Sequence, residues 1–508
     1  MMPSVSLLVL VVLALLVVYR VLRPSRLPPG PPGLPLLGNV LDIPLKGLFL
    51  KLDEWKRTNG GVFSLSAPGQ KIVVLADAKS AADVLDKMSA PTSGRPRYIM
   101  MNEIMAGNLT ITGIPANERW KRCRRIIHEG FNARASEGYA AIQEEESGRL
   151  CRYLLQNPGC DLYPALERTS CGVILRALYD APSLFTSPTG EEKVQKLAEQ
   201  MDAFMKAAMP LAYMVEMFPV LKYLPRWMAP FKAYGEDFFK DSNAYLENLY
   251  QEGCSTKQEG GKAKGFAVAS EEARDHFGVT TQEAAWVSGV LYAAGSETSA
   301  AAVQSLCMAM LLYPEVQKKA KAEIDAVLGP HAPTLADRPN MPYMHAIVKE
   351  TLRWRPPLPT GFPHLATENV DYGDYTIPKG TIVIGSIWSI NHDAPTFGDP
   401  SVFRPERFLS SDGKTLSTPL SNYHDDDIAY GHGRRLCPGR YFANNMLFVE
   451  MTYLLWAFDI LHAKDEYGRT IDPPNCQFVD RGLTCRPADF PCVFQPRQST
   501  LADVLPPI

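Results

Sequence analysis

The stretch YGHGRRLCPGRYFANN, residues 430–445, holds one cysteine, Cys437, between two glycines and directly before a predicted helix. Such a cysteine can be a buried structural thiol, a nucleophile, one ligand of a metal cluster or a single axial ligand. A phosphatase-type Cys-x5-Arg loop would require arginine where the sequence has Ala443. Tetrahedral zinc would require further Cys or His ligands, and His432 alone is close. The nucleophile and the zinc cluster are therefore disfavoured.

The neighbours of Cys437 favour a single axial ligand on a haem iron. Pro438 is predicted at the first helical position, so that Cys437 lies where free N–H groups favour the thiolate. Gly433 and Gly439 lack side chains and let the backbone approach a flat macrocycle. Arg435 can offer two donors to a haem propionate. Without this pattern, a lone cysteine would be interpreted as a small buried hydrophobe.

Residues 430–439 resemble the haem-binding signature of the cytochrome P-450 family, Phe-x-x-Gly-x-Arg-x-Cys-x-Gly, with Tyr430 in place of the phenylalanine. The resemblance implies a mainly α-helical fold with a small β-rich region in a single large domain. It implies a haem (iron protoporphyrin IX) with Cys437 as the thiolate ligand of the iron. It also implies a monooxygenase that uses O2.

Residues 294–299, AGSETS, lie midway along a helix predicted from Thr281 to Leu312 and resemble the family's oxygen-activation motif. By this resemblance Gly295 opens room beside the iron, Thr298 hydrogen-bonds dioxygen, and Glu297 relays protons toward it. Taken alone, these residues would fit a helix contact with a surface glutamate equally well.

Further matches follow in the family's order along the chain. Glu350 and Arg353 lie one helical turn apart and, by resemblance, form a structural charge network with Arg407 of the segment FRPERF. On its own the Glu-x-x-Arg pattern is also typical of a solvated helical pair. The resemblance implies propionate contacts from three other residues, Trp120, Arg124 and His364.

The pattern outside these motifs is mostly helical. Strands are predicted in VFSLSA and KIVVLA, between Gly61 and Leu75. An exposed loop is predicted at residues 252–277, which are rich in Gly, Lys and Glu. Helices are predicted at 78–88, at 281–312 behind a Thr280–Glu283 capping box, at 314–329 and from Pro342 to the Pro356–Pro357 pair.

The N-terminus predicts a membrane anchor at residues 1–22. Residues 5–19 are apolar except for Ser6, basic residues follow at once, and no cleavage site for a signal peptide is evident. The flanking charge predicts a single-pass helix with the rest of the chain in the cytosol, and resemblance implies the endoplasmic reticulum membrane. A proline-rich hinge is predicted at 23–39, where a plain linker is the alternative, and the catalytic domain at 40–508.

Composition narrows the functional classes. The net charge of −3 over 508 residues gives no support to nucleic-acid binding, which requires a basic domain or stripe. The ten cysteines contain no Cys-x-x-Cys pair and are predicted to be reduced thiols. No reductase domain is expected, so electrons come by resemblance from a separate membrane-bound NADPH-cytochrome reductase. Its predicted docking face comprises Lys121, Arg122, Arg125 and Arg440, although a merely solvated charged face would have the same composition.

The family's pocket segments correspond to residues 98–114, 204–231, 287–298, 358–363 and 481–485. The second contains five methionines and indicates a lipophilic substrate, although core packing explains such composition equally well. The proline-rich hinge and the stretch around Cys437 resemble those of fungal microsomal members of the family, which often oxidise terpenoids or polyketides. The alternatives are a thiolate-haem isomerase or dehydratase that needs no O2, and a non-catalytic haem- or ligand-binding protein. The oxygen-activation motif argues against an isomerase or dehydratase. A test for NADPH consumption distinguishes a monooxygenase from a non-catalytic binding protein.

Overall fold

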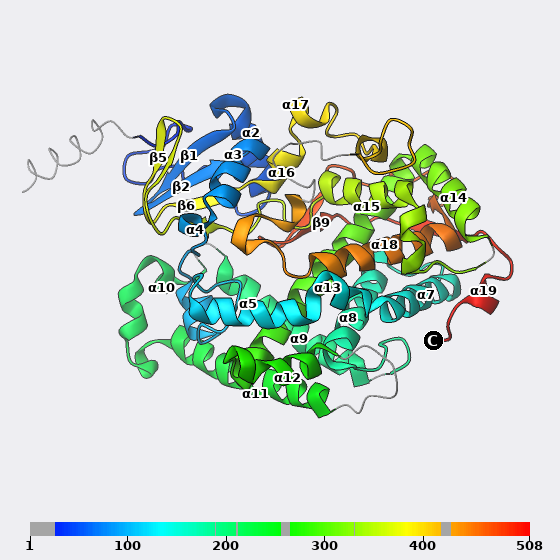
Figure 1. The fold of residues 1–508 in the computed structure, drawn as a ribbon. Coiled ribbons are helices and arrows are strands. Elements are labelled where there is room, and N and C mark those ends of the chain that lie inside the picture. Colours follow the sequence, from blue (N-terminus) through cyan, green and yellow to red (C-terminus); the bar gives the residue numbers. More distant parts are fainter. Residues whose placement is uncertain (1–25, 188, 210–211, 256–264, 330, 418–427) are drawn as a thin grey trace, which may run out of the picture.

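The computed structural model describes residues 26–187, 189–209, 212–255, 265–329, 331–417 and 428–508 (Figure 1). Helices dominate these residues, and the strands form small sheets. The main sheet lies with α2, α3 and α4 at one end of the molecule, and the long helices fill the rest (Figure 1). The prediction of a mainly helical fold with a small β-rich region is confirmed.

The α-helices of the described residues are α2 (Leu48–Asn59), α3 (Ala78–Ala81), α4 (Ser89–Thr92), α5 (Glu118–Phe131), α6 (Ala133–Glu137), α7 (Ala140–Gln156), α8 (Leu162–Tyr179), α9 (Thr189–Ala208), α10 (Met214–Met217), α11 (Pro230–Ser255), α12 (Phe266–Phe277), α13 (Thr281–Leu312), α14 (Pro314–Leu328), α15 (Pro342–Trp354), α16 (Ile387–Asn391), α17 (Ala394–Phe397), α18 (Arg440–Ala457) and α19 (Leu501–Val504). The π-helical segments are η1 (Ala82–Lys87) and η2 (Ile99–Ile104). The 3-10 turns are η3 (Pro219–Tyr223), η4 (Arg226–Met228), η5 (Leu335–Asn340), η6 (Pro405–Phe408), η7 (Ile428–Tyr430) and η8 (Gly433–Arg435). The strands are β1 (Val62–Ala67), β2 (Gln70–Leu75), β3 (His364–Leu365), β4 (Val370–Tyr372), β5 (Tyr375–Ile377), β6 (Ile382–Gly385), β7 (Phe458–His462), β8 (Phe478–Asp480), β9 (Cys485–Pro487) and β10 (Cys492–Pro496).

The main sheet has the strand order β1-β2-β6-β3. β1 and β2, which the sequence predicts as strands, pair antiparallel, and β2 pairs in parallel with β6, Val73 opposite Val383. Part of the proline-rich segment runs beside β1, because Ser64 N donates to Pro29 O at 2.8 Å. The predicted boundaries of the hinge and the catalytic domain stay predictions.

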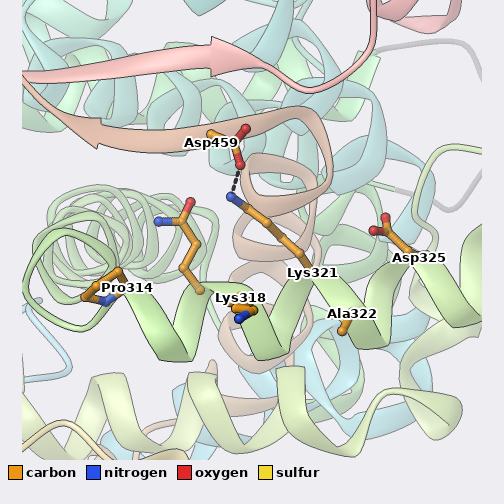
Figure 2. A pocket seen from close by; sticks show the side chains of 7 residues that line it. Pro314, Lys318, Lys321, Ala322, Asp325 and Asp459 are labelled. Carbon is orange, nitrogen blue, oxygen red and sulfur yellow. Dashed lines mark hydrogen bonds and ion pairs between the residues drawn. The ribbon is translucent and has the colours of Figure 1, made fainter.

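The 32-residue helix α13 has the predicted bounds. Its capping box is present: Glu283 N donates to Thr280 Oγ1 at 3.1 Å, and Thr280 N donates to Glu283 Oε2 at 3.0 Å. Pro314 begins α14, which leaves α13 at an angle of 108°. α14 is held to β7 by an ion pair between Lys321 and Asp459 (Figure 2).

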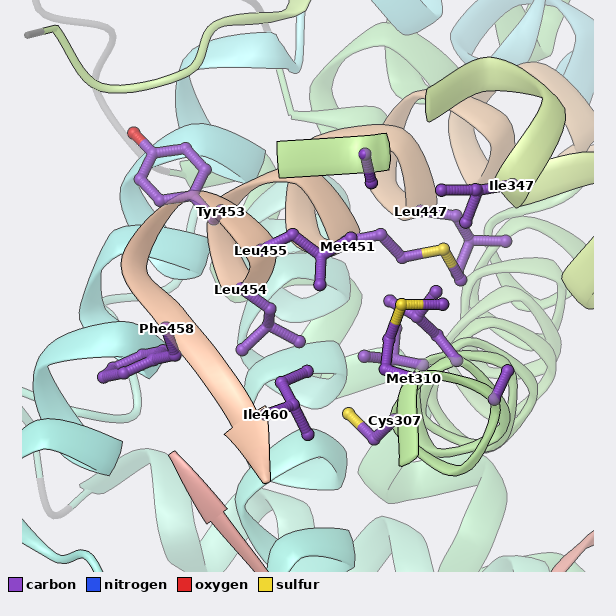
Figure 3. Packing of buried hydrophobic residues seen from close by; sticks show 14 of the residues in the cluster. Cys307, Met310, Ile347, Leu447, Met451, Tyr453, Leu454, Leu455, Phe458 and Ile460 are labelled. Carbon is purple, nitrogen blue, oxygen red and sulfur yellow. The ribbon is translucent and has the colours of Figure 1, made fainter. Parts of the chain in front are cut away.

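The largest apolar cluster lies where α13, α15 and α18 meet. Figure 3 shows Cys307 and Met310 of α13 beside Leu447 and Met451 of α18, with Ile347 of α15. Each buried side chain of this size contributes roughly 1.5–3 kcal/mol of transfer free energy. The cluster therefore fixes α18, and with it the cysteine that precedes this helix.

Residues 252–277, predicted to be a loop, are helical at both ends. α11 continues to Ser255 and α12 spans Phe266–Phe277, whereas residues 256–264 lie outside the described part. Apolar burial explains the difference, because Phe266 is fully buried and packs against the α5 backbone at Gly130. The helix predicted at 78–88 is present as α3 followed by the wider turns of η1.

The predicted anchor at residues 1–22 lies outside the described residues and stays a prediction. Among the residues that the structure describes, no single helix combines the length and hydropathy needed to cross a membrane. α13 and α14 meet that criterion only as a pair, with the sharp bend between them.

Candidate functional site

Cys437 lies in the turn that leads into α18. Its N–H donates to Tyr430 O at 2.9 Å and closes the preceding loop. The prediction that Pro438 occupies the first helical position is wrong, because Gly439 is the N-cap residue and Pro438 precedes it. The first helical bonds start from the Gly439 carbonyl, which accepts from Ala443 N at 2.8 Å.

The surroundings of Cys437 act on its thiol in two opposite ways. Burial raises the pKa of the Cys437 thiol, whereas the Gly439 N–H and the guanidinium groups of Arg124 and Arg440 lower it. The Gly439 N–H favours the thiolate, as the sequence predicts for the start of a helix, and the two arginines add to this effect, but burial outweighs all three. A metal cation bound to the sulfur would supply the missing positive charge.

Three arginines from distant parts of the chain meet beside this loop. Arg435 donates to Ser93 O at 3.0 and 2.9 Å and to Ile114 O at 2.7 Å. The Arg435 guanidinium lies 4.7 Å from the centre of the Trp120 ring, and the Arg124 guanidinium lies 5.9 Å from it. Arg95 completes the group, which is called the arginine cluster below.

The arginine cluster is electrostatically costly. Burial, followed by the charges of Arg95 and Arg124, lowers the pKa of Arg435 to about 9, and burial lowers that of Arg95 to about 10. Within the described residues, no carboxylate pairs with any of the three guanidinium groups. Buried cations normally have an anionic partner. The cluster therefore fits an anionic ligand, and the two propionates of a haem beside Cys437 meet this requirement.

Arg95 is the functional candidate that sequence reasoning missed. It donates to Thr112 O at 3.0 Å and to Pro363 O at 2.7 Å, and its residue is only 9% exposed. In the sequence it stands in SGRPR before an apolar run, and that context does not distinguish a buried arginine from a solvated one. Only the fold brings it to Arg435.

His364 of β3 is buried near the same cluster. Its Nδ1 lies 2.9 Å from Thr92 O, and a carbonyl can only accept, so Nδ1 carries the proton. Burial, with the Arg95 charge, lowers the pKa of His364 well below its usual value. The neutral ring has no second N–H to donate, so the predicted propionate contact would require an added proton and stays a prediction.

The two glycines of the signature differ in what surrounds them. A Cβ on Gly433, whose φ is +54°, would lie 2.1 Å from Leu85 O of η1. Gly433 is therefore required for close contact with the η1 backbone, and its predicted role beside the macrocycle stays a prediction. A Cβ on Gly439 would meet no described heavy atom within 4 Å, so the space beside Gly439 is compatible with a flat ligand.

The oxygen-activation motif lies on a partly open stretch of α13. Ala294 is exposed although most of the helix is buried, and Thr298 Oγ1 donates to Ala294 O at 2.7 Å. A Cβ on Gly295 would lie 2.7 Å from Ile174 Cδ1, so this glycine permits close packing of α13 on α8. Its predicted role beside the iron stays a prediction.

Glu297 is directed toward the turn between β8 and β9. Its Oε1 accepts from Thr484 Oγ1 at 2.8 Å and lies 3.4 Å from Arg481 Nη1. Glu167 of α8 is close enough that Glu297 raises its pKa, although burial is the larger cause. The predicted proton carrier is thus a half-buried carboxylate with fixed donors and a second carboxyl group nearby.

Glu350, Arg353 and Arg407 form the network that the sequence predicts. Arg353 binds Glu350 through two bonds of 2.6 and 2.8 Å, and Arg407 Nε lies 3.1 Å from Glu350 Oε1. Arg353 also donates to Asn391 O and Pro400 O, at 2.9 and 2.8 Å. The network therefore ties α15 to the last residue of α16 and to the loop that follows α17.

Three arginines and one acidic residue, Glu129, are among the residues that line a groove of about 320 Å³ next to Pro438. Arg125 and Arg440 of the predicted docking face line it, together with His128, Phe277 and Tyr441. Lys121 and Arg122 are paired instead, with Glu118 and Glu283. A second groove, of about 380 Å³ beside α14, contains none of the motif residues (Figure 2).

Comparisons with known proteins agree with this geometry. The family model described as Cytochrome P450 matches residues 28–484. "Cytochrome P450 monooxygenase 58" of Postia placenta is 38% identical over 473 residues, which cover 93% of this chain and 89% of that protein. "Cytochrome P450 monooxygenase COX2" of Coprinopsis cinerea is 33% identical, with 93% and 89% covered.

A solved structure is similar in fold. It is described as "Zebra fish cytochrome P450 another structure with Abiraterone", and it matches with a TM-score of 0.70 and 22% sequence identity. The match covers 89% of this chain and 100% of that one.

Proposed function

Since this chain belongs to the cytochrome P450 family and is a haem-thiolate monooxygenase, we propose that it oxidises small lipophilic molecules in fungal secondary metabolism. The proposal includes a single-pass anchor in the endoplasmic reticulum membrane and a separate NADPH-cytochrome reductase as the electron donor. The observation that carries the chemistry is Cys437 beside a partly buried arginine cluster that has no carboxylate partner among the described residues.

The residues that would hold the haem follow from this geometry. Cys437 would bind the iron, and Arg95, Arg124 and Arg435 would bind the propionates, with Trp120 packed against two of the guanidinium groups. When bound, the haem supplies dioxygen activation, and the thiolate ligand favours O–O cleavage. Gly439 leaves the macrocycle space next to the ligand loop.

The residues of α13 would hold and move protons. In the structure the Thr298 hydroxyl donates to Ala294 O. By rotating, it can donate instead to a ligand beside the exposed stretch of α13. Glu297 is anchored by Thr484 and can pass a proton from the side of Glu167 toward Thr298. This carboxyl and hydroxyl pair favours a monooxygenase over an isomerase, a dehydratase or a binding protein.

A lipophilic substrate is supported by the apolar segment at residues 213–231. Its exposed side chains include Met217, Phe218 and Trp227, and its buried ones pack toward η2. Electron supply through the groove at Arg125 and Arg440 is supported by its position beside Pro438, next to the proposed ligand.

The first test is a carbon monoxide difference spectrum of the reduced protein, with Cys437→Ser as the variant and Cys476→Ser as the control. Cys476 is exposed and lies outside the site. We expect a strongly red-shifted Soret band for the wild type and the control, and its loss in Cys437→Ser. A wild-type band typical of histidine ligation would refute thiolate ligation. Substrate-dependent NADPH consumption with added reductase then tests the monooxygenase reaction.

A further inference from the structure

The loop that carries Cys437 is bound to η1 through a carboxylate. Asp86 Oδ1 accepts from Gly433 N at 2.5 Å, and Asp86 Oδ2 lies 3.4 Å from His432 Nδ1. Asp86 and Gly433 are 347 residues apart in the sequence, so no local pattern of residues creates this bond. The contact therefore depends on how the fold places η1 against the loop.

Gly433 is a residue that the backbone of the loop does not fix by itself. Its φ of +54° lies in the left-handed region, and glycine loses more conformational freedom on ordering than other residues do. Gly433 begins η8, so its N–H has no carbonyl of that turn to bind. A carboxylate gives this N–H a stronger acceptor than a neutral group would. Asp86 therefore holds the loop at a point where its own backbone constrains it little.

Backbone hydrogen bonds connect this point to the cysteine. Leu436 N donates to Gly433 O at 3.1 Å. Cys437 N donates to Tyr430 O at 2.9 Å and closes the loop. The loop is thus a compact turn, with Asp86 bound to its middle and the sulfur at its end, and a shift of the middle displaces the end as well.

η1 is itself firmly attached to the rest of the protein. Leu85 belongs to the same apolar cluster as Val73 and Val383, which pair in the main sheet. Thr92 Oγ1 donates to Val84 O at 3.0 Å and ties α4 to η1. Groups that contact the ligands of a metal from behind commonly hold those ligands in place. A carboxylate on η1 is positioned to do this, because its own backbone is fixed relative to the sheet.

We propose that Asp86 is a positioning residue of the haem-thiolate centre, and that its bond to Gly433 keeps the Cys437 sulfur on the iron. The role rests on the proposed function, because it requires Cys437 to be the iron ligand. Without the bond, the sulfur leaves the iron more easily. It then keeps the bonding electron pair and takes a proton from water, so that no oxidant or reductant is needed. Asp86 acts through Gly433 and is not a catalytic residue.

Conversion of the carbon monoxide complex tests this role. In the reduced, haem-loaded, full-length protein, the measured quantity is the rate at which the red-shifted Soret band gives way to a band typical of thiol or histidine ligation. Asp86→Ala is expected to convert at least about tenfold faster than the wild type, because a charge-assisted bond is lost. Asp86→Asn retains an oxygen that can accept from Gly433 N and is expected to show a smaller acceleration. This variant also covers the case that the alanine variant binds no haem.

Asp83→Asn is the matched control. Asp83 lies on the same element and pairs with Lys79 and Lys87, at 2.9 and 2.7 Å. Its variant should convert at the wild-type rate, and the far-ultraviolet circular dichroism of every variant should stay constant during the measurement. Equal rates in the wild type and the Asp86 variants would overturn the positioning role. So would an equal acceleration by Asp83→Asn, or conversion that only accompanies loss of the helical signal.

Hydrogen exchange tests the contact independently of the haem spectrum. The Gly433 amide is expected to exchange at least about tenfold faster in Asp86→Ala than in the wild type or Asp83→Asn. Unchanged exchange would show that Asp86 does not hold the loop and would overturn the role. A wild-type protein without the red-shifted band would instead refute thiolate ligation, and with it the proposed function. The exchange rate of Gly433 would still decide whether Asp86 holds the loop.

Discussion

Glu450 shows how strongly a single residue can depart from its ordinary chemistry in this core. It lies on α18, is fully buried, and neither of its carboxylate oxygens has a hydrogen-bond partner among the described residues. Burial raises its pKa from 4.5 to about 8. Burial also raises the pKa values of its neighbours Cys151 and Cys307, so that they remain neutral as well. The acid is thus held in its protonated form at neutral pH.

We expect the free energy of unfolding to fall as the pH rises from about 4.5 to about 8. The folded state keeps the Glu450 proton over this interval and the unfolded state does not, so the slope is about 1.4 kcal/mol per pH unit. Below about pH 4.5 the stabilising contribution of the protonated Glu450 is fully present, and above about pH 8 it is lost. Urea unfolding of the wild type and of Glu450→Gln at several pH values measures it. The variant should lack this slope, and the exposed Glu466→Gln should retain it; equal slopes in all three proteins would contradict the assignment.

The arginine cluster contains one residue, Arg95, that sequence patterns do not predict to be part of the site. Arg435 and Arg124 could be chosen because each belongs to a spaced motif, whereas Arg95 stands in no such motif. Its proximity to Arg435 depends on hydrogen bonds to Thr112 and Pro363, which only the folded chain brings together. The position of Pro438 was missed for a different reason, since a helix boundary depends on which carbonyl accepts the first bond.

At the scale of elements, local signals decided which predictions were correct. α13 has its predicted bounds because a capping box opens it and Pro314 follows its end. α15 begins at Pro342 and ends before the Pro356–Pro357 pair for the same kind of reason. α12 was missed because its stability comes from contacts of Phe266 with α5, which a Gly- and Lys-rich neighbouring sequence obscures.

The Glu350 network is the connection between elements that we expect to be most sensitive to mutation. Glu350→Gln leaves Arg353 and Arg407 without their anionic partner, and breaking such a buried ion pair costs roughly 3–5 kcal/mol. Thermal or urea unfolding should show this loss. Lys319→Met is the control, because it removes only a surface pair with Glu406 and should change the free energy of unfolding by no more than about 1 kcal/mol. A similar, small effect of both substitutions would contradict the structural role.

At the scale of the whole molecule, the groove beside Pro438 joins the predicted docking face to the arginine cluster, because Arg124 lines it together with Arg125 and Arg440. Arg125 is exposed at this groove, and the structure describes no ion pair for it.

We expect Arg125→Glu to slow reduction by the reductase severalfold at low ionic strength, because it reverses a charge on the proposed docking surface. The difference should shrink as salt screens the charges. Stopped-flow formation of the carbon monoxide complex measures the rate, and reduction by dithionite should be unaffected. Arg134→Glu changes the same charge on an exposed residue outside the groove. An equal effect of both variants would mean that only net charge matters.

The parallel pairing of β2 with β6 also sets an order of events during translation. Val73 must wait for Val383, which the ribosome adds 310 residues later (383 − 73). At about 5–20 residues per second, this delay is roughly 15–60 s. During that time one side of β2 is an unpaired strand edge on a nascent chain, a surface that invites wrong partners. Completion of the main sheet is therefore a late step in biogenesis, and chaperones have their longest opportunity to act at this edge.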